Sequence, residues 1–137
     1  MRRLALTYLI ILLLLLTFSS ACSGQKADLG KEFALHIGQT TDISGENLQV
    51  TFTSVVEDSR CPTGVSCIWA GQVSCAVQII YRNATRTIVL TQPGLNDLPD
   101  RAKFEDYIIE FRVEPYPQAE KQIADFDYTL LMKFSNK

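Results

Sequence analysis

Apolar and polar residues alternate with a period of two along most of the chain beyond residue 31. Six segments show this alternation, and they lie at residues 33–37, 48–53, 73–81, 87–91, 107–113 and 128–134. In each segment one face is apolar and the other mostly polar, as in a strand that is half buried on a core. Turn-forming residues separate the segments, and no stretch has the period of a long helix. The pattern predicts an all-β domain, an antiparallel β-sandwich or partly open barrel of about 6–8 strands.

The predicted domain occupies residues 32–137, and only short helical turns, at 118–123 or 101–104, fit between its strands. The segment before it, residues 22–31, is polar and contains two glycines. This composition is typical of a flexible linker. We therefore expect residues 22–31 to form a tether in front of the domain.

Residues 1–21 have the order of a secretory signal peptide. Arg2 and Arg3 are followed by an uncharged, leucine-rich run from 4 to 18 and then by small side chains. This apolar run has 15 residues, whereas a membrane-spanning helix needs about 20. We expect a signal that is removed on export rather than a permanent transmembrane helix.

The end of this leader, Ser19-Ser20-Ala21-Cys22, resembles the lipobox of bacterial lipoproteins, although that motif usually begins with Leu rather than Ser. The resemblance implies that Cys22 becomes the first residue of the mature protein and carries palmitate or similar acyl chains. Two or three such chains hold a protein stably on a membrane. Ser23 is compatible with outer-membrane sorting in that family, which implies a lipid-anchored place in the bacterial cell envelope, at the outer membrane or periplasmic face. The alternative is an ordinary signal peptide that leaves Cys22 free.

The net charge of the mature chain restricts the kinds of partner that it is expected to bind. Loss of Arg2 and Arg3 with the leader changes the balance from 13 basic and 15 acidic side chains to 11 and 15, a net charge of −4. No cluster of Lys and Arg is present to bind phosphates. We therefore expect no nucleic acid among the partners.

One loop, residues 57–71, has an unusual composition. It contains two of the three cysteines beyond Cys22 and the only tryptophan. Its string Ser59-Arg60-Cys61-Pro62, followed by Cys67-Ile68-Trp69-Ala70-Gly71, resembles a motif in small uncharacterised exported bacterial proteins. The segments Pro115-Tyr116-Pro117 and Asp127-Tyr128 are also similar to features of these proteins. The resemblance implies a β-rich exported domain and brings no established activity.

An exported compartment is oxidising, so a disulfide is expected among these cysteines. Cys67 and Cys75 lie eight residues apart along a predicted strand, about 26 Å at about 3.3 Å per residue, while a disulfide needs Cα atoms within about 7 Å. Cys75 also shares the inward face of Val73 and Val77, where it acts as a small core residue. The sequence predicts a Cys61–Cys67 bridge.

A metal site is the alternative use of these thiols. Cys61, Cys67 and Cys75, with His36, include soft ligands that suit Cu(I) or Zn. Their spacings are wider than those of usual zinc ligand pairs, and His36 lies on the outward face of its strand. A thiol–disulfide exchange role lacks the C-x-x-C motif. We expect no metal and no cofactor.

Asp58, Arg60 and Trp69 admit two interpretations. In the first, they brace the loop: Arg60 pairs with Asp58 or Glu57 and stacks on Trp69. Trp69 shares the inward parity of Val73 and Cys75, which predicts that its ring is tucked under the loop. In the second, they form a recognition surface: Arg60 and Trp69 face outward, and both residue types are enriched in binding hot spots. We favour bracing.

No catalytic motif is recognisable. The chain has no Ser-His-Asp set, no H-E-x-x-H and no glycine-rich phosphate loop, and its single histidine leaves little for acid–base chemistry at neutral pH. A hydrolase-type enzyme would need a carboxylate pair from a small group of acids: Asp97, Asp100, Glu105 and Asp106. We expect instead a non-catalytic binding or structural module that contacts an envelope protein or a small ligand.

Overall fold

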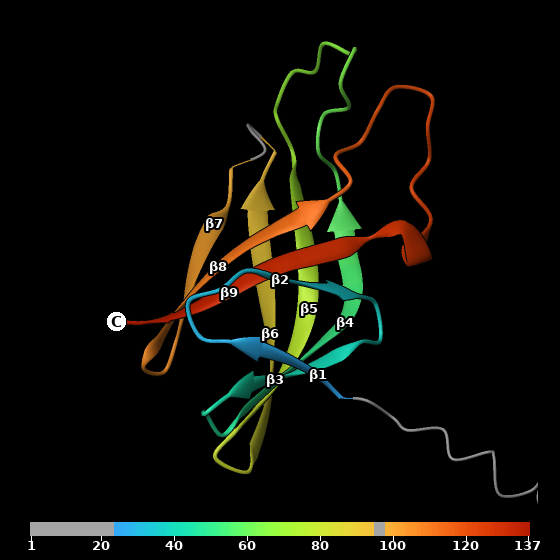
Figure 1. Cartoon of the computed structure of the whole chain (residues 1–137). Coiled ribbons are helices and arrows are strands. Elements are labelled where there is room, and N and C mark those ends of the chain that lie inside the picture. Colours follow the sequence, from blue (N-terminus) through green and yellow to red (C-terminus); the bar gives the residue numbers. More distant parts are fainter. Residues whose placement is uncertain (1–23, 95–97) are drawn as a thin grey trace, which may run out of the picture.

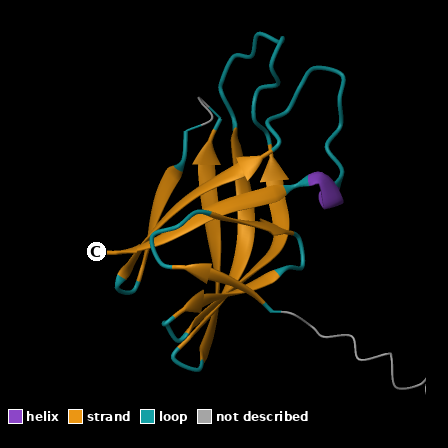
Figure 2. Ribbon diagram, viewed as in Figure 1, coloured by secondary structure: helices purple, strands orange, loops and turns teal. Residues whose placement is uncertain are grey.

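The protein is a β-sandwich of two sheets (Figure 1) with no α-helix in the part of the chain that the structure describes (Figure 2). The computed structural model describes residues 24–94 and 98–137. The first sheet has the order β1 (Gln25–Asp28), β3 (Thr40–Ser44), β4 (Leu48–Asp58), β5 (Gln72–Tyr81) and β6 (Ala84–Pro93). The second has the order β2 (Phe33–His36), β9 (Thr129–Asn136), β8 (Tyr107–Glu114) and β7 (Asp100–Phe104). Every pairing is antiparallel except that of β1 with β3.

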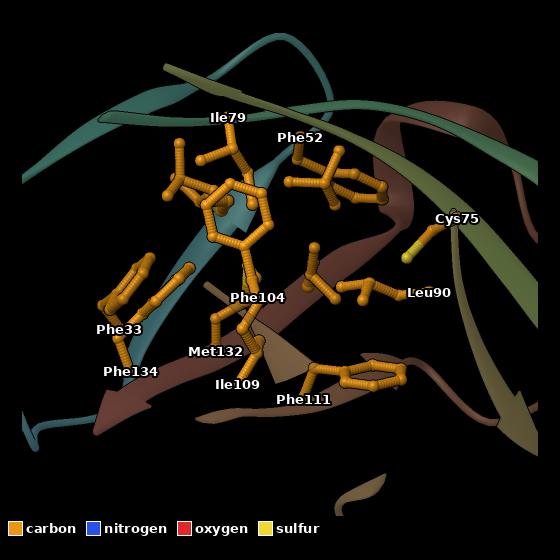
Figure 3. Packing of buried hydrophobic residues seen from close by; sticks show 14 of the residues in the cluster. Phe33, Phe52, Cys75, Ile79, Leu90, Phe104, Ile109, Phe111, Met132 and Phe134 are labelled. Atoms are coloured by element: carbon orange, nitrogen blue, oxygen red, sulfur yellow. The ribbon is translucent and has the colours of Figure 1, made fainter. Parts of the chain in front are cut away.

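The core lies between the two sheets and is formed by the apolar strand faces that the alternation predicts. In β8 every second side chain is buried, and in β5 the inward face includes Val73 and Cys75, both without exposed surface. Figure 3 shows side chains from both sheets meeting in this space. Within the second sheet, the rings of Phe33 and Phe134 stack with their centroids 6.3 Å apart. The predicted sandwich is confirmed, and the sheets do not close into a barrel.

Nine strands are present in the described residues, three more than the alternating segments. The additional strands β1, β3 and β7 have four or five residues each and bury only one or two side chains. Residues 101–104, where a helical turn seemed to fit the sequence, belong to β7, because they pair with β8. Residues 118–123 form a turn, and the helical turn that the structure does contain is a 3₁₀ helix at Asp125–Asp127.

Part of the segment that was expected to be a flexible tether forms strand β1. The flexible segment was predicted for 22–31, but Gln25–Asp28 pairs with β3 and buries Ala27. A short edge strand needs only one inward side chain, so its polar sequence resembles that of a linker. Gln25–Asp28 therefore belong to the domain, and Cys22 lies outside the described residues. None of the described residues forms a helix long and apolar enough to cross a membrane.

The long connections gather at one end of the sandwich, which we call the loop end (Figure 1). It carries residues 59–71 between β4 and β5, residues 115–128 between β8 and β9, and the described part of the β6–β7 connection, residues 94 and 98–99. The short turns at 45–47 and 82–83 lie at the opposite end, the turn end (Figure 1).

Candidate functional site

The candidate site is the loop of residues 59–71, which we call the stapled loop. At its base the β4–β5 ladder continues, because the Ser59 N–H donates to the Gln72 carbonyl at 2.8 Å and the Cys61 N–H donates to the Ala70 carbonyl at 2.9 Å. Beyond this point a Cys61–Cys67 disulfide, with Cα atoms 5.9 Å apart, closes the tip. The predicted pairing is confirmed. The bridge restricts the loop to few conformations.

Arg60 fixes the base of the loop from inside the protein. Its side chain is 2% exposed, and its Nε and Nη2 donate to the two carboxylate oxygens of Asp58 at 2.8 and 2.6 Å. Nη1 also donates to the Val113 carbonyl at 2.8 Å, and Nη2 to the Pro115 carbonyl at 2.9 Å. Val113 lies at the end of β8 in the other sheet, and Pro115 directly follows this strand. Arg60 therefore joins the two sheets under the stapled loop, and the predicted pairing with Asp58 is confirmed.

Two tyrosines complete this buried cluster. The guanidinium of Arg60 lies 5.1 Å from the ring centre of Tyr116, so Tyr116 takes the stacking position that was expected of Trp69. The Tyr128 hydroxyl donates to Asp58 at 3.1 Å. Burial raises the pKa of Tyr128 to about 12, and the neighbouring Asp58 carboxylate acts in the same direction. At neutral pH the hydroxyl is thus a permanent donor to Asp58.

Two glycines allow the loop base to approach its neighbours closely. Gly71 has a φ of +71°, and a Cβ there would lie 1.8 Å from the Ser59 carbonyl oxygen. A Cβ on Gly94 would lie 2.3 Å from the Ala70 carbonyl oxygen. The Gly94 N–H donates to the Gly71 carbonyl at 2.9 Å, and the Gly94 carbonyl accepts from the Tyr116 hydroxyl at 2.7 Å. No side chain fits at either position without movement of this backbone.

The tip of the stapled loop is held from the side by residues 115–128. The Thr63 N–H donates to the Pro117 carbonyl at 3.0 Å, and the Ala119 N–H donates to the Thr63 carbonyl at 3.1 Å. Backbone hydrogen bonds therefore connect two loops that come from different sheets. These bonds and those of Arg60 hold the stapled loop against the rest of the domain, while the disulfide closes it internally.

The stapled loop presents large apolar side chains to solvent. Ile68 is fully exposed and Trp69 is 66% exposed, so the prediction of a tucked tryptophan is wrong. The inward parity was extended from β5 to Trp69, but the positive φ of Gly71 interrupts the extended backbone between them. An open hollow of about 530 Å³ lies against the loop, and its lining includes Trp69, Tyr116 and Gly94.

The residues of the alternative metal site are not brought together. Cys61 and Cys67 are consumed by the disulfide, while Cys75 is a free thiol in the core whose pKa burial raises to about 12. His36 is exposed on β2, as its outward parity predicts, with Nδ1 3.2 Å from the Thr129 hydroxyl. Within residues 24–94 and 98–137 no three His, Cys, Asp or Glu side chains form a group that could hold a metal ion.

The acids considered for hydrolysis lie at both ends of β7. Asp100 begins β7, whereas Glu105 and Asp106 follow the other end of this strand. Asp97 lies outside the described residues. Glu105 and Asp106 are neighbours in the β7–β8 turn, where Glu105 pairs with Arg86 and Asp106 lies 3.9 Å from Arg82.

Sequence reasoning missed the residues that support the site but lie far from it in the chain: Gln92, Gly94, Val113, Tyr116 and Tyr128. Gln92 is almost fully buried, accepts from the Val113 N–H at 2.9 Å and donates to the Leu98 carbonyl at 3.1 Å. The only signal for the tyrosines is their occurrence in the segments around 116 and 128 that resemble the exported proteins. No protein family, no curated protein and no solved structure matches the chain.

Proposed function

We propose that the protein is a lipid-anchored binding module of the bacterial cell envelope, without catalytic activity, whose loop end recognises a partner. The exposure of Ile68 and Trp69 on a loop with a fixed base is the observation that carries this proposal. Exposed apolar side chains are normal when they are single. Here three of them, Val65, Ile68 and Trp69, line one hollow. Leu98 and Phe126 also lie in loop-end connections, so five of the seven large exposed hydrophobic residues in the described part of the chain are at this end.

Rigidity makes this surface suitable for binding. Ordering a flexible loop on association costs free energy, and a loop that is already ordered avoids this cost. Tryptophan is one of the residue types enriched among binding hot spots, where truncation to alanine commonly lowers the binding free energy by about 2 kcal/mol or more. The disulfide and Arg60 hold the Trp69 ring outward before any partner arrives. On this proposal both interpretations hold, because Asp58 and Arg60 brace the loop while Trp69 forms the recognition surface.

The envelope location is supported by two features of different kinds. The leader and its lipobox-like end provide an export and acylation signal at Cys22. The Cys61–Cys67 disulfide is typical of an oxidising compartment outside the cytoplasm. Mass spectrometry of the purified protein tests the acylation directly, since a mature chain that begins with an unmodified Cys22 contradicts it.

The binding test compares matched variants of the intact acylated protein, used as bait in its own envelope extract. The variant Ile68→Ser/Trp69→Ala removes the apolar tip. Val89→Ser is the control, because Val89 is 58% exposed but lies within β6, away from the loop end. We expect one protein to be retained by the wild type and by the control and to be lost with the tip variant. Equal retention by all three proteins would refute the proposal.

A further inference from the structure

The stapled loop has no exposed charge and carries three large exposed apolar side chains, Val65, Ile68 and Trp69. Residues 61–71 include no charged side chain, and the only charged residue of the loop, Arg60, is buried against Asp58. Surfaces that insert into membranes usually combine apolar side chains with Lys and Arg, which bind anionic headgroups. The stapled loop has no accessible basic side chain for this purpose.

The neighbouring connection, residues 115–128, contacts the stapled loop through Thr63 and carries an excess of acids. The exposed charged side chains of this connection are three acids and one base: Glu120, Asp125, Asp127 and Lys121. Phe126, 80% exposed, lies between two of the acids. Its insertion into an anionic bilayer would bring both carboxylates against like charge, which is unfavourable. A protein surface with an apolar pocket and basic side chains around it is the complementary partner.

Strand β1 limits the position of the membrane anchor. Only two residues separate Cys22 from β1, so three residue steps reach at most about 11 Å. Gln25 is level with Val50 through β3, and the stapled loop begins beyond Asp58, about 25 Å farther along β4. An acylated Cys22 thus holds the β1 edge near the membrane, while the loop end lies at the other end of the sandwich (Figure 1).

The hollow beside Trp69 is open to solvent rather than enclosed. Sites for small ligands usually bury most of the ligand surface in a cleft. An open hollow that combines polar surface with the side chains of Ile68 and Trp69 suits side chains that protrude from another protein. We infer that the loop end binds a protein that presents an apolar surface bordered by Lys and Arg, on the side of the domain away from the anchoring membrane. This inference rests on the proposed function and names the partner of the same surface.

The membrane is the competing occupant, and the chain's own fluorescence tests it. Trp69 is the only tryptophan, so its emission reports on the loop end alone. The full-length acylated protein is reconstituted in vesicles of phosphatidylethanolamine and phosphatidylglycerol that carry brominated acyl chains. We expect no quenching by the brominated lipids and unchanged quenching by acrylamide in water. Strong lipid quenching with a blue shift would overturn the inference, because the bilayer would then be the occupant.

A second reporter separates this result from a failure of anchoring. In Trp69→Phe/Lys26→Trp the only tryptophan lies on β1, where Lys26 is exposed. We expect its emission to be quenched by lipids with a spin label on the headgroup, because the β1 edge lies near the membrane. If this reporter is silent because the protein does not bind vesicles, the proposed lipid anchoring fails. The charge complementarity is then judged by the crosslinking experiment alone.

Site-specific crosslinking in the producing cells tests the partner. A photoreactive phenylalanine replaces Trp69, and the control places it at Asn83 in the turn end. We expect a protein adduct from position 69 alone, reduced about tenfold by Asp125→Lys/Asp127→Lys. The charge control is Asp106→Lys, whose side chain is 76% exposed at the β7–β8 turn. Absence of an adduct, or an adduct that both charge reversals leave unchanged, would overturn the inference.

Discussion

Replacement of Arg60 by leucine is expected to lower the free energy of unfolding by about 3–5 kcal/mol, the range for breaking a buried ion pair from one side. The structure explains why the loss is large. The carboxylate of Asp58 is 9% exposed and would keep only the Tyr128 hydroxyl and one backbone N–H as donors. The carbonyls of Val113 and Pro115 would lose their hydrogen bonds to the guanidinium. Domains of this size have free energies of unfolding of about 5–15 kcal/mol. Over most of that range the variant still folds, so its loss of stability can be measured.

Two further variants make the assay specific. Arg60→Lys keeps the charge but cannot make the four donor contacts of a planar guanidinium, so we expect an intermediate loss. Arg101→Leu is the matched control, because Arg101 pairs with Glu110 at 2.7 Å but has a side chain that is 72% exposed. Exposed pairs contribute about 0–1 kcal/mol. Urea titrations followed by far-ultraviolet circular dichroism give the three values with the disulfide intact.

The burial argument also predicts coupling. Asp58→Asn/Arg60→Leu leaves no buried charge, so its loss is expected to be smaller than the sum of the two single losses. If Arg60→Leu costs no more than Arg101→Leu, or if the double variant is additive, Arg60 does not hold the loop in the way that its contacts imply.

Three other predictions concern the loop and the core. Gly38→Ala is expected to lower the free energy of unfolding by about 1–2 kcal/mol. Gly71→Ala is expected to cost considerably more, because both glycines have positive φ but only the second would place its Cβ against a carbonyl oxygen; equal losses in urea titrations would contradict this. Cys61→Ser and Cys67→Ser are each expected to cost about 2.4 kcal/mol on the chain-entropy model, and the double variant little more, so additive losses would argue against a shared bridge. Cys75 is expected to resist iodoacetamide in the folded protein even at pH 10. Burial raises its pKa from the ordinary 9.0 to about 12, so the thiol stays protonated and unreactive until the pH approaches the raised value. Peptide mapping with and without urea measures this modification, and rapid labelling without urea would show that Cys75 is accessible.

The alternation of residues along each strand determined most of the fold. Side-chain direction in an extended chain is set locally, so the inward faces of β5 and β8 follow from the sequence. The same local rule places Cys75 in the core and leaves Cys61 and Cys67 to pair. The short strands β1, β3 and β7 escaped this reasoning, because their few inward residues give no periodic signal. They form because longer strands offer them an edge.

The candidate site was determined only in part by sequence. The motif indicated the disulfide and the pair of Arg60 with Asp58, because these groups are near neighbours in the chain. The Val113 carbonyl that Arg60 also binds comes from 53 residues away, and only the packing of the two sheets brings it there. The exposure of Trp69 likewise depends on how Gly71 turns the chain and how closely Gly94 packs against it. Local periodicity specifies which way a strand residue points, whereas the direction of a loop residue is decided by whatever the tertiary structure places beneath it.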